Sequence, residues 1–177
     1  SGAKETSYEV YCFERTVRTS YLDENYCVIV GATLLPLLRG PFTVELRLPV
    51  HWKFVSSALE FRSAGRGRWL ARVRDDDHWI DSPIVAAAPG FGGQGKFMLQ
   101  GIPHHITWVG IGCARSMKEM EEAFKKISAV TCKMFGGAPF KKYWFLLQFG
   151  HKLYGGLEHR DSQLTQFDGG SLSDQKQ

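Results

Sequence analysis

One long amphipathic segment, residues 116–135, stands in a chain whose other segments look like short strands, and it limits the possible folds most. Ser116 and Glu119 form a capping box at its start. Gly136 and Pro139 end it. The apolar residues recur at steps of three and four and form one stripe: Met117, Met120, Phe124, Ile127, Val130 and Met134. The sequence therefore predicts one helix of roughly 30 Å beside a fold made mainly of sheets.

The first part of the chain reads as a series of short strands. Residues 42–48 alternate between apolar and polar side chains, which is typical of a strand with one buried face. Aspartates 75–77 favour the start of a short helix or a loop. Other strand-like segments are 7–18, 26–30, 52–55, 58–61, 69–73, 84–88, 96–99 and 105–111. We therefore predict a mainly β chain, with an all-β, sandwich-like N-terminal domain over residues 1–113.

The segments after residue 113 have a different character. The helix is followed by an apolar run at 143–149, predicted to be a buried strand, and by a further extended run. Residues 114–164 are thus expected to form a helix plus a hairpin. From residue 165 the chain is polar and rich in Gly and Ser, so residues 165–177 are predicted to be a disordered tail.

Composition excludes several classes of function. The net charge is +4, and no run of five basic residues occurs, so no nucleic acid is expected as a partner. No apolar run approaches the roughly 20 residues of a membrane span, so no membrane contact is expected. The four cysteines lie far apart without a C-x-x-C pair, which indicates free thiols. Free thiols and the lack of a visible signal peptide favour a cytoplasmic location.

Common catalytic motifs are absent or lie in the wrong context. Residues 90–95 match G-x-G-x-x-G, but a strand-like segment follows instead of a helix, so a flexible hairpin loop is predicted. His104 and His105 are adjacent and would point to opposite faces of a strand. The acidic cluster 75–77 lacks the spacing of a calcium loop. No H-E-x-x-H or G-x-S-x-G occurs, so no complete catalytic set and no metal site is predicted.

The run 152–162, KLYGGLEHRDS, is the best candidate for a binding site. Gly155 and Gly156 allow another backbone to approach closely, and Glu158 and His159 would project to opposite faces. The carboxylate could hold a cationic amine while the strand edge pairs with an extended peptide. The alternative interpretation is structural: a strand end with a glycine bulge and an exposed turn.

Several segments together resemble the glycyl aminopeptidase family, zinc metallopeptidases with a C-terminal PDZ domain. They are VRTSYLDENY at 17–26, DSPI at 81–84, GIPHHITWVG at 101–110, MFGGAPFKKYWFLL at 134–147 and YGGLEHRDS at 154–162. The resemblance implies an N-terminal all-β domain followed by a thermolysin-like α+β catalytic domain. This chain would hold the first domain and only the beginning of the second, at 114–164.

The family is similar to the larger aminopeptidases that carry a G-A-M-E-N strand. By that resemblance, Gly155, Gly156, Leu157, Glu158 and His159 occupy the five places, with Gly for Ala, Leu for Met and His for Asn. Glu158 would bind the free α-amino group of a peptide substrate, and the backbone of 155–157 would line the peptide.

The zinc helix of the family would lie beyond residue 177, so no cofactor is expected in this chain and zinc only in the parent protein. The implied function is the N-terminal portion of a zinc aminopeptidase that removes small N-terminal residues (Gly or Ala) and is inactive alone. The alternative is a non-enzymatic β-sandwich module that binds peptide or protein through an exposed edge strand. Self-association through the apolar stripe of the helix is a further expectation.

Overall fold

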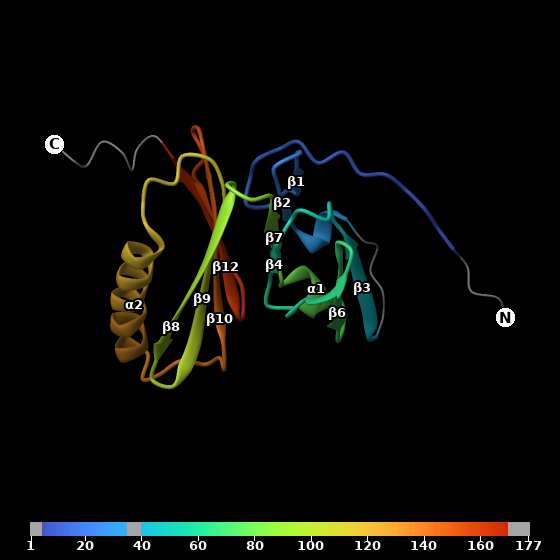
Figure 1. Cartoon of the computed structure of the whole chain (residues 1–177). Coiled ribbons are helices and arrows are strands. Elements are labelled where there is room, and N and C mark those ends of the chain that lie inside the picture. Colours follow the sequence, from blue (N-terminus) through green and yellow to red (C-terminus); the bar gives the residue numbers. More distant parts are fainter. Residues whose placement is uncertain (1–4, 35–39, 170–177) are drawn as a thin grey trace.

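The computed structural model describes residues 5–34 and 40–169 and confirms a mainly β fold built from packed sheets (Figure 1). The strands are β1 Tyr21–Leu22, β2 Tyr26–Ile29, β3 Phe42–Arg47, β4 Phe54–Ser56, β5 Arg62–Gly65, β6 Arg68–Val73, β7 Ile84–Ala87, β8 Gly92–Leu99, β9 Ile102–Gly110, β10 Tyr143–Gly150, β11 Gly155–Glu158 and β12 Ser162–Asp168. The helices are α1 Asp76–Ile80, α2 Met117–Met134 and the 3₁₀ turn η1 Gly31–Thr33.

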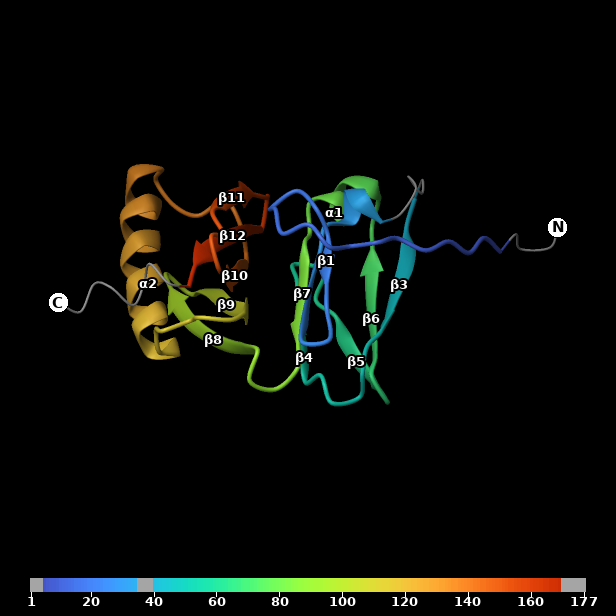
Figure 2. The ribbon, with the colours of Figure 1, turned by 90° about the horizontal axis from the view of Figure 1, so that it is seen from above.

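Four layers follow one another, as seen from above in Figure 2. A three-stranded sheet, β3-β6-β5, packs on a four-stranded sheet, β1-β2-β7-β4. A five-stranded sheet, β11-β12-β10-β9-β8, packs on the other face of the four-stranded sheet, and α2 forms the last layer. We call the first two sheets with α1 the first unit, and the five-stranded sheet with α2 the second unit.

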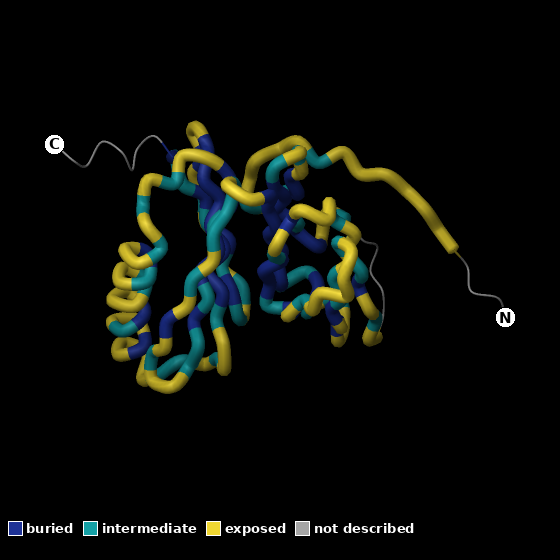
Figure 3. Tube along the Cα trace, viewed as in Figure 1, coloured by how far each residue is buried: buried dark blue, intermediate teal, exposed yellow. Residues whose placement is uncertain are grey.

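The four-stranded sheet is covered on both faces, and the sequence of β7 reflects this. All four residues of β7 are buried. Ile84 and Ala86 face the three-stranded sheet, whereas Val85 and Ala87 face the five-stranded sheet. A strand buried on both sides needs apolar residues at every position, which explains the short continuous apolar run and the dark central band in Figure 3.

The predicted alternation at 42–48 is confirmed in β3. Val44 is buried in the core of the first unit, with Phe42 and Leu46 packed against the same core, while Thr43 and Arg47 are exposed. The sandwich-like character of the N-terminal part follows from this packing.

The second unit is built around a crossover from β9 through α2 to β10. The strands β9 and β12 both pair in parallel with β10, and β8 and β11 close the two edges as antiparallel strands. Ser116 caps α2 in the predicted capping box, with the Glu119 side chain accepting from the Ser116 backbone N–H at 2.8 Å. Met120 is buried against Phe145 and Leu147 of the sheet.

Only the first half of the predicted apolar stripe of α2 packs on the sheet. Met117, Met120 and Phe124 contact the sheet core. In the second half the buried residues are Ser128 and Cys132, and Ile127, Val130 and Met134 are 61%, 62% and 74% exposed. The small side chains on the inner face leave space between this half of α2 and the sheet.

Two predicted strands of the first unit are wrong. Residues 7–18 are irregular and largely exposed, with Tyr11 at 87%, because no strand of the described chain pairs with them (Figure 3). Residues 58–61 form a turn before β5 instead of a strand. After β2 the chain forms η1 up to Thr33, and residues 35–39 lie outside the described residues.

The glycine-rich loop predicted at 90–95 is correct only at 90–91 and wrong at 92–95, since Gly92–Leu99 form β8. The strands β8 and β9 lie before residue 113, yet they join β10 in the five-stranded sheet. The second unit therefore contains a hairpin on each side of α2, more than the predicted helix plus one hairpin.

The predicted disordered tail begins too early. Residues 165–168 complete β12, which lies between β10 and β11 in the sheet. Polar Gln and Thr residues fit there because burial alternates along β12: Leu164 and Gln166 are buried, whereas Gln163 and Thr165 are partly exposed. Residues 170–177 of the predicted tail lie outside the described residues.

Candidate functional site

The candidate site begins with β11, an edge strand of the five-stranded sheet. It pairs with β12 on one side, with Gly156 opposite Thr165 and Glu158 opposite Gln163. No strand of the described chain pairs with its other side. The backbone groups on that outer edge are therefore available to an extended peptide.

The two glycines of β11 have different surroundings. A Cβ atom at Gly155 would lie 3.2 Å from Cγ1 of Val17, so this position faces the N-terminal segment. A Cβ atom at Gly156 would meet nothing within 4 Å. Gly156 therefore borders open space, and it lies on the same face of the strand as Glu158.

Glu158 is exposed and lies on the α2 side of the sheet, because its cross-strand partner is Gln163. The phenol of Tyr143 lies close enough for the charge of Glu158 to act on it. Burial first, and then the negative charges of Glu158 and Asp161, raise the pKa of Tyr143 to about 12. Tyr143 is therefore a neutral hydrogen-bond donor near Glu158 at neutral pH.

His159 directly follows the last residue of β11, and its side chain reaches the first unit. Its side chain is 7% exposed, and its Nδ1 lies 3.1 Å from Oδ1 of Asp81 in the first unit. The next residue, Arg160, donates its backbone N–H to Oδ2 of the same carboxylate at 2.9 Å. The site thus includes Asp81, 78 positions away from His159 in the sequence.

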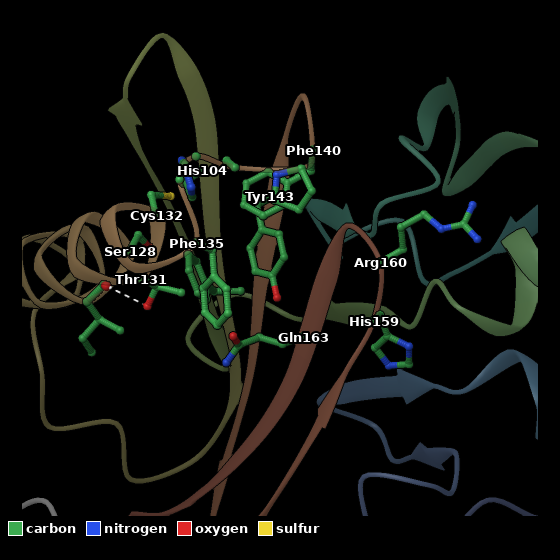
Figure 4. A pocket seen from close by; sticks show the side chains of 16 residues that line it. His104, Ser128, Thr131, Cys132, Phe135, Phe140, Tyr143, His159, Arg160 and Gln163 are labelled. Carbon is green, nitrogen blue, oxygen red and sulfur yellow. Dashed lines mark hydrogen bonds between the residues drawn. The ribbon is translucent and has the colours of Figure 1, made fainter.

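A cavity of about 670 Å³ adjoins this site (Figure 4). It lies between the second half of α2, the following segment 135–140 and the sheet, and we call it the α2 cavity. Its walls include Cys132, Phe140, Tyr143 and Gln163 as well as the turn after β11. Its lining is largely apolar, which suits a hydrophobic side chain or segment.

His104 forms part of the wall of the α2 cavity and is almost fully buried. Its ring stacks on Phe97 at 4.8 Å, and its Nδ1 lies 3.0 Å from the carbonyl oxygen of Ile102. The Nδ1 therefore carries the hydrogen, and the buried Nε2 is left without a partner in the structure. Burial lowers the pKa of His104 from its ordinary value, so the ring is neutral at pH 7.

The described residues do not fit a zinc site. No group of three His, Cys, Asp or Glu side chains within 5–34 and 40–169 converges on one point. The Nδ1 of His159 is already engaged by Asp81, and His104 and His105 lie on opposite faces of β9, stacked on Phe97 and Trp144. No reaction step through a metal can be assigned to these residues.

Other predicted features have structural roles. Asp75 caps α1 by accepting from the His78 backbone N–H at 2.8 Å. All four cysteines are free thiols. Within the part of the chain that the structure describes, neither helix has the length and apolar character needed to cross a membrane.

Comparison with known proteins supports a metallopeptidase family. Residues 1–88 match the Peptidase M61 N-terminal domain. The chain is also similar to the crystal structure of an aminopeptidase N family protein from Idiomarina loihiensis, with 26% identity and a TM-score of 0.81 over 95% of this chain and 29% of that one. No curated protein matched the chain significantly.

Two more distant structures share the fold alone. An M1 zinc metallopeptidase from Deinococcus radiodurans has 12% identity and a TM-score of 0.51, over 81% of this chain and 36% of that one. Native yeast LTA4 hydrolase has 10% identity and a TM-score of 0.53, over 80% of this chain and 23% of that one. The chain thus spans well under half of each solved structure. Together with the match to the Peptidase M61 N-terminal domain, the comparisons support a peptidase-related N-terminal portion.

Proposed function

We propose that this chain is the N-terminal portion of a zinc-dependent aminopeptidase of the glycyl aminopeptidase type, which removes small N-terminal residues from peptides. Within it, β11 is the strand that holds the substrate. The zinc ion and the general base would come from parts of the parent outside this chain, so the chain alone is inactive.

The observation that carries the proposal is the combination of an open strand edge and an exposed carboxylate. The outer edge of β11 can pair with an extended peptide, and Gly156 leaves room for its backbone. Glu158 lies at the end of the same strand, where its charge can hold the free α-amino group. Tyr143 and Gln163 add neutral polar groups beside it.

The apolar α2 cavity and the exposed half of α2 fit the same proposal. Ile127, Val130 and Met134 are more than half exposed, and Ile127 also lines the cavity. Uncovered apolar surface of this kind is normally buried by another part of a protein. We propose that the remainder of the catalytic domain covers it in the parent, and that self-association covers it when the chain is alone.

The experiment is an NMR titration of the ¹⁵N-labelled chain with tripeptides that begin with Gly, Ala or Phe, each with a free or an acetylated N-terminus. We expect the free Gly and Ala peptides to shift the amide signals of β11, with an affinity near the millimolar range typical of one ion pair and a few backbone bonds. Acetylation and Glu158→Gln should each weaken binding by about tenfold.

Equal binding of free and acetylated peptides would contradict the aminopeptidase assignment and favour an edge-binding module. Zinc titration provides a second test: stoichiometric zinc binding by this chain together with hydrolysis of Gly- or Ala-amides would contradict its inactivity alone.

A further inference from the structure

The turn between β11 and β12 is held by one carboxylate from the first unit. Asp81 is the C-cap residue of α1, and its backbone N–H is bonded back into that helix. Its Oδ1 lies 3.1 Å from Nδ1 of His159, and its Oδ2 accepts the backbone N–H of Arg160 at 2.9 Å. The two oxygens thus fix a side chain and the neighbouring peptide group at once.

The rest of the turn is tied to its own sheet. The His159 N–H donates to the carbonyl oxygen of Ser162 at 2.8 Å, and the Trp144 N–H donates to that of Asp161 at 3.0 Å. These bonds set the path of the backbone between the strands. They leave the His159 side chain, which is 7% exposed, to be oriented by Asp81.

The contact also selects the tautomer of a neutral His159 ring. A carboxylate can only accept hydrogen bonds, so the hydrogen of a neutral imidazole sits on Nδ1. The buried Nε2 has no partner in the structure. Loss of Asp81 would leave both ring nitrogens buried without partners, which is costly, and the ring would have to turn toward water.

We propose that Asp81 is a positioning residue for Glu158, an inference that rests on the proposed function of β11. His159 directly follows Glu158, the last residue of β11, so fixing its side chain restricts the backbone at the end of the strand. The pairing with Gln163 places Glu158 on the α2 side, where Tyr143 lies, and the contact of His159 with Asp81 holds the end of β11 in this orientation (Figure 4 shows His159, Tyr143 and Gln163). The first unit therefore acts on the site by holding the strand end that carries the amine-binding carboxylate, although it contributes no substrate contact.

The test compares Asp81→Ala and Asp81→Asn with the control Glu60→Gln. Glu60 also bridges the two units, through Lys142 at 2.7 Å, but both partners are about half exposed and neither touches the turn. Three readouts are measured on the whole chain: amide hydrogen exchange of residues 155–161, the ¹⁵N signature of the His159 tautomer, and the Kd of triglycine.

In Asp81→Ala we expect exchange at Arg160 and a Kd for triglycine each raised by about tenfold, the size of one lost charge-assisted hydrogen bond. The His159 tautomer should change from Nδ1–H to a mixture. Asp81→Asn keeps one acceptor oxygen and should show smaller effects in the same direction. This variant therefore tests the proposal if Asp81→Ala fails to fold. Glu60→Gln should change none of the three.

An unchanged Kd in both Asp81 variants, with normal binding by the unmodified chain, would overturn the positioning role alone. If amide exchange of residues 155–161 and the His159 tautomer are both unchanged, Asp81 does not hold the turn, and this result would also overturn the positioning role. A failure of the unmodified chain to bind triglycine would instead contradict the proposed function.

Discussion

Replacing Leu164 with alanine should destabilise both units together. Leu164 lies in β12 and is fully buried in the core that joins the five-stranded sheet to the four-stranded sheet. That core contains Val85 of the first unit and Val109 and Leu146 of the second. A side chain at this interface therefore contributes to the packing of both units.

The magnitude follows from its complete burial. Leu→Ala removes three carbon atoms, worth roughly 2.4 kcal/mol at about 0.8 kcal/mol per buried methylene. The remaining cavity adds to this loss, and measured Leu→Ala changes in cores are about 2.7–5 kcal/mol. We expect the free energy of unfolding to fall by about 3–5 kcal/mol. At about 2–4 °C per kcal/mol for a chain of this size, Tm should fall by roughly 6–20 °C.

The assay is urea unfolding followed by tryptophan fluorescence and by far-UV circular dichroism. Trp52 and Trp79 report on the first unit and Trp144 on the interface. The two signals should shift together in one transition. Leu22→Ala is the matched control, because Leu22 is 58% exposed and its replacement should change stability by less than about 0.5 kcal/mol. A loss below about 1 kcal/mol for Leu164→Ala, or two separate transitions, would refute the shared core.

Four further substitutions test local features. Gly110→Ala should lower the free energy of unfolding by at least about 2 kcal/mol, because Gly110 has φ +105° and a Cβ atom there would overlap the carbonyl oxygen of Phe149. Gly156→Ala should change it by less than about 1 kcal/mol, since a Cβ atom there meets nothing within 4 Å. Thermal melts compare the two variants. Ser116→Ala should lower stability by about 1 kcal/mol through loss of the capping box, and equal urea midpoints would contradict this. Burial lowers the pKa of His104, so the stability that its neutral ring contributes is complete above the unfolded pKa of 6.5 and is lost as pH falls through the folded pKa. His104→Gln should therefore flatten the decline in the free energy of unfolding between about pH 7 and 5. An unchanged slope would argue against a buried neutral ring.

Periodicity in the sequence predicted the elements whose packing is decided locally. The helix α2 and the strand β3 are confirmed because an amphipathic pattern and end signals agree within each segment. The segment 7–18 has an equally good alternation, but a strand also needs a partner, and the partner is decided by the rest of the fold. The polar half of β12 was missed because a strand inside a mixed sheet can bury glutamine, as Gln166 does by donating to Gln148 at 2.8 Å.

The candidate site was predictable only in part, for the same reason. The paired glycines and the Glu158-His159 step could be read from consecutive residues. Asp81 could not be linked to them, since a contact across 78 positions carries no local signal, although its DSPI segment and the YGGLEHRDS segment both belong to the resemblance. The α2 cavity was equally hidden, because it depends on how Ser128 and Cys132 face the sheet.

The two edges of the five-stranded sheet are treated differently, and this difference bears on function. At β8 the helix α2 packs against the edge strand, where Gly95 lets it approach, and Oε1 of Glu121 accepts the Lys96 N–H at 2.9 Å. Open edges invite unwanted pairing and are usually protected in this way. At β11, no described residue makes a hydrogen bond to the outer backbone edge. A chain that covers one edge with a helix and leaves the other open, beside an oriented carboxylate, has the arrangement that strand-wise binding of a peptide requires.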